Sequence, residues 1–167
     1  IGLGTQLVAV AIGVAVGAGA ALGGRFTDNI LMRVVDVTYA FPDLLAIILM
    51  VIFTPTAGLI GTMKVTGAIA IVRIPIYARL VRGSVLSIKE KEYVEACRAL
   101  GVRDPWILVR HVLPNCLAPI IVTTTLGVAT SIIVEATLSF LGLGTQPPTP
   151  SWGWDLKANV AFIQANM

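Results

Sequence analysis

Charged residues are scarce in this chain of 167 residues. Asp, Glu, Lys and Arg together make up 13% of it, about half of the share in an average globular domain. Hydrophobic residues make up 56%, so a soluble fold would have to expose a large apolar surface, which promotes aggregation. The composition therefore disfavours a soluble protein and favours one whose apolar surface faces the lipid of a bilayer.

Metal ligands and thiols are also few. The chain has one histidine, His111, and two cysteines, Cys97 and Cys116, which we interpret as reduced packing residues. It contains no phosphate-binding loop of the form Gly-x-x-x-x-Gly-Lys-Ser/Thr, and no cluster of Ser, His and Asp at catalytic spacing. We therefore expect no ATPase site, no metal and no cofactor bound by this chain.

The net charge of +3 does not indicate a nucleic-acid-binding protein, because the basic residues do not form one stripe. The start of the chain lacks the basic flank, apolar run and small-residue cleavage site of a signal peptide in the required order. The chain opens at Ile1 without a methionine and stops at Met167 soon after a new segment begins. We interpret it as a fragment of a longer protein that lacks sequence at both ends.

The chain does contain apolar stretches of the length that a membrane span requires, since about 20 helical residues cross ~30 Å of hydrocarbon. We predict an all-α, polytopic membrane protein with a single domain over residues 1–167 and about four complete spans. The predicted spans are residues 5–24, 37–53, 65–80 and 112–135. Between and after them, we expect a polar connection at 25–36, a loop at 54–67, a cytoplasmic region at 84–111 and an external loop at 136–156.

Small residues and proline give the spans local features. Two Gly-x-x-x-Gly patterns in the first span, Gly13 with Gly17 and Gly19 with Gly23, predict close contact with another helix. Pro42 in the second span predicts a kink or a break, because proline removes an intrahelical hydrogen bond.

Three ionisable residues lie in or near the predicted spans: Asp43, Arg73 and Glu135. Charged groups in a membrane usually face the protein interior or water, so each is a candidate for the substrate path. Structural roles are the alternative. Arg73 can snorkel or pair with Asp43, and Glu135 can belong to an internal pair.

The region 84–111 is polar and carries its own helix signals. Ser87 and Glu90 have the spacing of a capping box and predict a helix from Ile88 to Leu100, which Gly101 ends. Asp104 as a cap, followed by a proline, predicts the start of a second helix.

The first of these two helices has an apolar side and a charged side, and the charged side is spaced so that Glu95 can bridge its neighbours. The apolar side consists of Tyr93, Ala96, Cys97 and Leu100, and the charged side consists of Lys91, Glu95 and Arg98. One interpretation is a helix at the level of the lipid headgroups with solvated charges. The other is a helix that inserts into a groove on a cytoplasmic partner.

The basic residues orient the chain. If the region 84–111 is cytoplasmic, nine basic residues lie inside and two, Lys64 and Lys157, lie outside, as the positive-inside rule requires. The nine are Arg25, Arg33, Arg79, Arg82, Lys89, Lys91, Arg98, Arg103 and Arg110.

The polar region also carries a family motif, in which Glu95-Ala96-Cys97 is followed by Gly101 and by Leu113-Pro114. It resembles the membrane permeases of bacterial and archaeal ATP-binding-cassette importers, whose motif is Glu-Ala-Ala, three residues, Gly, nine residues, then an apolar residue before Leu-Pro. Cys97 replaces the second alanine and is small enough to keep close packing. His111 falls on the apolar position, with Val112 beside it.

Further stretches narrow the resemblance to the dipeptide, oligopeptide and nickel permeases. They are residues 31–36, 40–42, 77–82, 138–144 and 146–153. The resemblance implies the type I importer fold, with six spans in the complete protein and the polar region as the coupling helix. The coupling residues that it implies are Glu92, Tyr93, Glu95, Ala96, Cys97, Arg98, Leu100, Gly101, Leu113 and Pro114.

The resemblance also implies partners and a location. The partners are a sister permease in a heterodimer or homodimer, two ATP-binding-cassette subunits that hold ATP and magnesium, and an extracytoplasmic solute-binding protein. The location is the cytoplasmic (inner) membrane of a bacterium or archaeon.

Peptides are the substrate class that the resemblance favours, with nickel or another small solute as the alternative. From a different class, an ion-coupled secondary transporter would use Asp43, Arg73 and Glu135 as an ion path. A membrane-embedded enzyme is disfavoured because no catalytic cluster is present.

Overall fold

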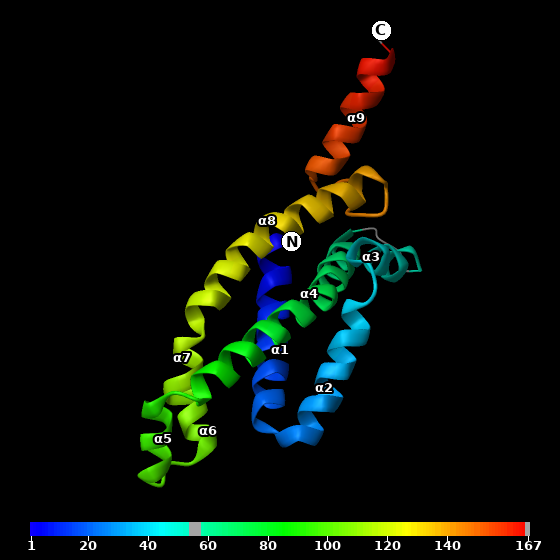
Figure 1. Cartoon of the computed structure of the whole chain (residues 1–167). Helices are drawn as coiled ribbons and strands as arrows, with labels where there is room; N and C mark the ends of the chain where they lie inside the picture. The colour runs from blue at the N-terminus through cyan, green and yellow to red at the C-terminus, as the bar shows by residue number, and fades with distance from the viewer. Residues whose placement is uncertain (54–57, 166–167) are drawn as a thin grey trace. The chain divides into compact units, whose positions relative to one another are not determined.

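A computed structural model describes the backbone of residues 1–53 and 58–165 and the side chains of residues 1–53 and 60–160. Every regular element in these ranges is a helix, as predicted (Figure 1). The elements are α1 (Gly2–Leu22), α2 (Gly24–Tyr39), α3 (Asp43–Ile52), α4 (Gly58–Lys89), α5 (Glu92–Ala99), α6 (Asp104–Ile107), the π-helix η1 (Leu108–Val112), α7 (Leu113–Asn115), α8 (Leu117–Phe140) and α9 (Trp152–Ala165).

Two helices in the described part of the chain, α1 and α8, are long and apolar enough to cross a membrane. A third span results if α2 and α3 are counted as one broken span. α4, which contains the predicted third span together with Lys64 and Arg73, is not among them. The described residues thus hold two or three candidate spans, where the sequence predicted about four.

The break between α2 and α3 falls where it was predicted. Pro42 stands directly before the first residue of α3, and a proline disfavours helical backbone at the residue that precedes it. The polar connection predicted at residues 25–36 is helical and lies within α2. Their charged residues have helical spacing and leave Val35 on a buried side.

α4 is longer than predicted, with 32 residues. It includes residues 58–67 of the predicted loop, while residues 54–57 lie outside the described residues. The predicted capping box at Ser87 is also wrong, since α4 continues past it to Lys89. Val85 and Ile88 are buried on this last part of the helix, so tertiary packing outweighs the local capping signal.

The chain divides into two compact units, each with its own hydrophobic core. The first comprises Ile1–Val8, Phe41–Val72 and Leu126–Met167, and its core is Ile47, Val51, Val65, Ala68, Ile69, Val72 and Leu138. The second comprises Ala9–Ala40 and Arg73–Thr125. Its core is Ala18, Ala21, Val81, Val85, Ile88, Val94, Ile107, Leu108, Val112, Cys116 and Ile120.

In the second unit, two glycines of α1 allow close approach to α4. A Cβ atom at Gly13 would meet the Cβ of Tyr77, and one at Gly17 would meet the carbonyl oxygen of Ala78. The predicted contact is therefore confirmed for this pair. The second pair makes no such contact with the described residues, and its helix contact stays a prediction. A Cβ at Gly19 would meet nothing within 4 Å. One at Gly23 would meet only Thr27 and Gly19, which lie four residues away in the sequence.

Candidate functional site

Residues 92–107, the middle of the polar region, hold two short helices, α5 and α6, which we call the hairpin (Figure 1). Gly101 lies between them with a φ of 79°, a conformation that glycine adopts without steric cost. The amide of Val102 donates to the carbonyl of Cys97 (3.1 Å), and the amide of Gly101 donates to that of Arg98 (2.9 Å). This is a Schellman ending, so the prediction that Gly101 ends the helix is confirmed.

α6 begins one residue earlier than predicted. Arg103 precedes it in extended backbone, and Asp104 and Pro105 are its first two residues. The prediction that Asp104 caps the helix is wrong. Its carboxylate instead accepts a 3.0 Å hydrogen bond from Nε of Arg98 on α5. Asp104 is the first residue of the helix and not its N-cap, so its carboxylate is not in the capping position. Both side chains are exposed, so the pair contributes less than about 1 kcal/mol.

α5 is attached to the core by one fully buried residue, Val94. Val94 belongs to the same core as Ile88 of α4 and Ile107 of α6. The burial of Val94 was not predicted from the sequence. Val94 and Cys97 are three residues apart and therefore lie on the same side of a helix. This spacing of two apolar residues was the signal that could have identified the inner side of α5.

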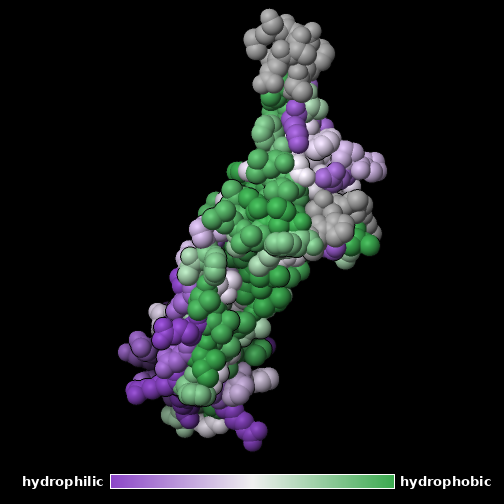
Figure 2. All heavy atoms as spheres, turned by 90° about the vertical axis from the view of Figure 1, so that its right-hand side faces the viewer, coloured by the Kyte–Doolittle hydropathy of each residue, from purple (hydrophilic) through white to green (hydrophobic). Residues whose placement is uncertain are grey.

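The remaining surface of α5 is open to solvent. Among the predicted coupling residues, those of α5 and the turn after it are exposed, apart from Cys97. The exposed ones are Glu92, Tyr93, Glu95, Ala96, Arg98, Leu100 and Gly101. Two further exposed apolar residues, Trp106 and Val109, follow on α6 and η1, and neither was predicted from the sequence as part of this surface. Figure 2 shows hydrophilic side chains gathered at the lower end of the view, an end that α5 and α6 share with the connection of α1 and α2 in Figure 1.

Glu95 forms no ion pair with another described residue, so the predicted bridge to its neighbours is wrong. Its neighbour Arg98 pairs with Asp104 instead. The carboxylate of Glu95 is therefore an exposed negative charge next to an apolar surface, a combination that a protein partner can recognise.

The end of the motif lies beyond the hairpin. Leu113, the first residue of α7, is half-buried and packs against the core that holds Val94. Pro114 follows it and is exposed. Leu113 thus supports the base of the hairpin.

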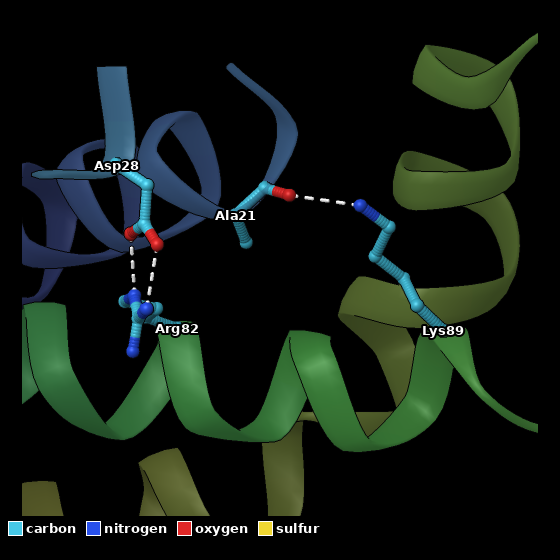
Figure 3. A network of polar contacts seen from close by, with 4 residues as sticks. All are labelled: Ala21, Asp28, Arg82 and Lys89. Carbon is cyan, nitrogen blue, oxygen red and sulfur yellow. Dashed lines mark hydrogen bonds and ion pairs between the residues drawn. The ribbon is translucent and has the colours of Figure 1, made fainter. Parts of the chain in front are cut away.

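Basic residues of α4 bind the ends of α1 and α2, as Figure 3 shows for two of them. Arg82 donates two hydrogen bonds to the carboxylate of Asp28, at 2.5 and 2.6 Å. Lys89 donates to the carbonyl oxygen of Ala21 at 2.8 Å. These contacts fix the helix that precedes the hairpin to the two helices beside it.

The pair of Arg82 and Asp28 is partly buried and bidentate, which makes it stronger than a typical surface ion pair.

Glu135, a candidate path residue, is buried in the first unit and surrounded by hydroxyl groups. Its Oε1 accepts hydrogen bonds from Ser139 (2.7 Å), Thr145 (2.8 Å) and Ser151 (3.0 Å). Glu135 also lines a cavity of about 750 Å³, together with Thr149, Ser151 and Asp155. The three hydroxyl partners were not identified from the sequence.

The other two candidate path residues belong to different units. Asp43 begins α3 in the first unit, and Arg73 lies within α4 in the second; both are half-buried. The suggested pairing between them stays a prediction.

Comparison with known proteins places most of the chain in one family. Residues 10–165 match the family described as "Binding-protein-dependent transport system inner membrane component". The chain is 43% identical over 158 residues to the dipeptide transport system permease protein DppC of Alkalihalophilus pseudofirmus, covering 94% of this chain and 50% of that protein. It is 42% identical over 157 residues to the glutathione transport system permease protein GsiD of Shigella sonnei, covering 92% of this chain and 50% of that protein.

The fold is similar to a solved structure as well. The MetNI methionine ABC transporter in an inward-facing conformation contains a chain that matches with a TM-score of 0.65 at 18% sequence identity, covering 98% of this chain and 84% of that one. The chain spans half the length of the two permeases above.

Proposed function

Because the chain belongs to the family of binding-protein-dependent transport system inner membrane components, we propose that it is part of the permease subunit of an ATP-driven importer. Two of its relatives are named as dipeptide and glutathione permeases, which supports di- and oligopeptides as the substrate class. The protein then forms the path through which these peptides cross the cytoplasmic membrane of a bacterium or archaeon.

The observation that carries this proposal is the hairpin. It exposes Glu95 and Leu100 to solvent, while Val94 fastens it to α4 through the core. An exposed element with a rigid base suits docking into a cleft of a cytoplasmic ATP-binding-cassette subunit.

In the proposed mechanism, two such subunits bind ATP and magnesium and close on each other. Their closure draws the hairpins of this permease and its sister permease together, and the spans change from inward-open to outward-open. An extracytoplasmic solute-binding protein delivers the peptide to the outward-facing cavity. This chain itself supplies no residue to ATP hydrolysis.

Reconstitution tests the proposal. The complete permease is placed in proteoliposomes with its sister permease, the ATPase subunits and the binding protein. We expect uptake of a labelled dipeptide that requires ATP and magnesium. Uptake driven by a proton or sodium gradient without the ATPase subunits would contradict the proposal and support ion-coupled transport through Asp43, Arg73 and Glu135.

The same vesicles test the substrate class and the orientation. Uptake of nickel, with no uptake of peptide, would replace peptide by metal as the substrate. Labelling of Lys91 only from the extracytoplasmic side would place the hairpin on the wrong side of the membrane for an ATPase partner.

A further inference from the structure

Lys89 is the last residue of α4, and its side chain reaches the end of another helix. Its Nζ donates a 2.8 Å hydrogen bond to the carbonyl oxygen of Ala21, in the last turn of α1 (Figure 3). The last four carbonyls of a helix have no partner within the helix, and the negative end of the helix dipole favours a cation. The bond therefore gives α1 a charge-assisted attachment to the end of α4.

The same side chain borders the hairpin. Lys89 lines a cavity of about 10 Å³ together with Leu22 of α1, Arg98 of α5 and Asp104 of α6. Such a space has room for no more than about one water molecule, so these elements meet closely around Lys89. Arg98 and Asp104 pair with each other, and Lys89 donates to α1 instead.

Apolar packing follows the same route. Val94 of α5, Ile88 of α4 and Ala21 of α1 belong to one hydrophobic core. Cores of this kind are close-packed and transmit displacement instead of absorbing it. Lys89 is thus the polar contact, beside this core, that connects the base of the hairpin with the end of α1.

We propose that Lys89 is a positioning residue that transmits movement of the hairpin to α1. This inference rests on the proposed function, in which ATPase subunits move the hairpin. Lys89 touches neither nucleotide nor substrate in this role. Without its ammonium group, the hairpin moves while α1 lags behind, and ATP is hydrolysed without a matching amount of transport.

The test compares three variants in the complete transporter, reconstituted with its ATPase subunits. Lys89→Met removes the ammonium, and Lys89→Arg keeps a cation that can donate to the carbonyl. Lys91→Met makes the same charge change two residues further on, at an exposed residue whose side chain does not cap α5. The measured quantity is dipeptide uptake per ATP hydrolysed, together with co-purification of the ATPase subunits.

For Lys89→Met, we expect normal co-purification and a fall in uptake per ATP of about fivefold or more, within the usual range of coupling between sites. Lys89→Arg restores most of the ratio, and Lys91→Met leaves it unchanged. A wild-type ratio in Lys89→Met overturns the proposal.

If the Lys89→Met complex does not assemble, Lys89→Gln replaces it in the test, because glutamine keeps a hydrogen-bond donor without the positive charge. A wild-type ratio in that variant also overturns the proposal, and a lowered ratio supports it. Failure of both variants to assemble, while Lys91→Met assembles, would assign Lys89 to folding and overturn its role in transmission. If the wild-type complex shows no ATP-dependent uptake, the proposed function fails instead.

Discussion

The hydroxyl of Ser151 donates a 3.0 Å hydrogen bond to the carboxylate of Glu135, which lies 16 residues earlier in the chain. Ser139 and Thr145 donate to the same oxygen. Glu135 therefore fastens the segment after α8 back onto that helix. A buried carboxylate with three donors is a structural anchor, whatever further role it has in a path for substrate.

Glu135→Gln should weaken this anchor, because the uncharged amide oxygen is a poorer acceptor than the carboxylate oxygen on which the three hydroxyls converge. We expect a loss of stability of about 1–3 kcal/mol, measured as a lower midpoint of thermal unfolding of the purified complex. Thr137→Val is the matched control on the same helix, since Thr137 donates to the carbonyl of Ile133 in its own helix. Equal midpoints for both variants would contradict the assignment.

Gly17→Leu should prevent the close approach of α1 to α4. A Cβ at this position meets the carbonyl oxygen of Ala78, so the backbone has to move, and overpacking of this kind costs about 1–3 kcal/mol. Gly19→Leu is the control, because a Cβ there meets nothing within 4 Å. The yield of folded protein after detergent extraction should fall for the first variant and not for the second. A similar yield for both would show that Gly17 makes no tight contact.

Val94→Ala and Tyr93→Ala should separate stability from docking. Val94 is fully buried, so its truncation leaves a cavity and costs about 2 kcal/mol. Tyr93 is exposed, and we expect its truncation to leave the midpoint of unfolding unchanged while it weakens co-purification of the ATPase subunits. The reverse result, with Tyr93→Ala destabilising and Val94→Ala neutral, would refute the buried position of Val94.

Exchanging the charges of Asp28 and Arg82 should reveal their pairing. Each single change, Asp28→Arg or Arg82→Asp, places like charges together and should lower the midpoint of unfolding. The double variant should recover part of the loss, because it restores opposite charges across the same bidentate contact. Additive losses in the double variant would show that the two residues do not interact in the protein.

Glu95→Ala should impair coupling to ATP hydrolysis while membrane insertion stays normal. Glu95 is exposed and has no ion-pair partner among the described residues, so its removal costs the fold little. We expect reduced stimulation of ATPase activity by the loaded binding protein and reduced uptake. Normal stimulation and normal uptake in this variant would exclude Glu95 from coupling.

Much of the local structure follows from the sequence because it depends on backbone chemistry. Gly101 ends α5 since the turn requires a positive φ, and Pro42 separates α2 from α3 because it removes an amide donor and restricts the residue before it. The Ser87 signal failed for a different reason. It competes with burial of Ile88 on a helix that is still packed against the core, and packing contributes more than a cap.

By itself, the sequence determined the helical class, the apolar character suited to lipid, the hairpin between apolar segments and the motif around Glu95, because hydrophobic content, helix endings and motif spacing are local properties. Only the tertiary structure decided that Val94 is the buried anchor, that three hydroxyls surround Glu135, that Gly17 and not Gly19 meets another helix, and that Lys89 holds the end of α1. Most of these contacts join residues far apart in the chain, and their partners are selected by how whole helices pack, which no local pattern encodes.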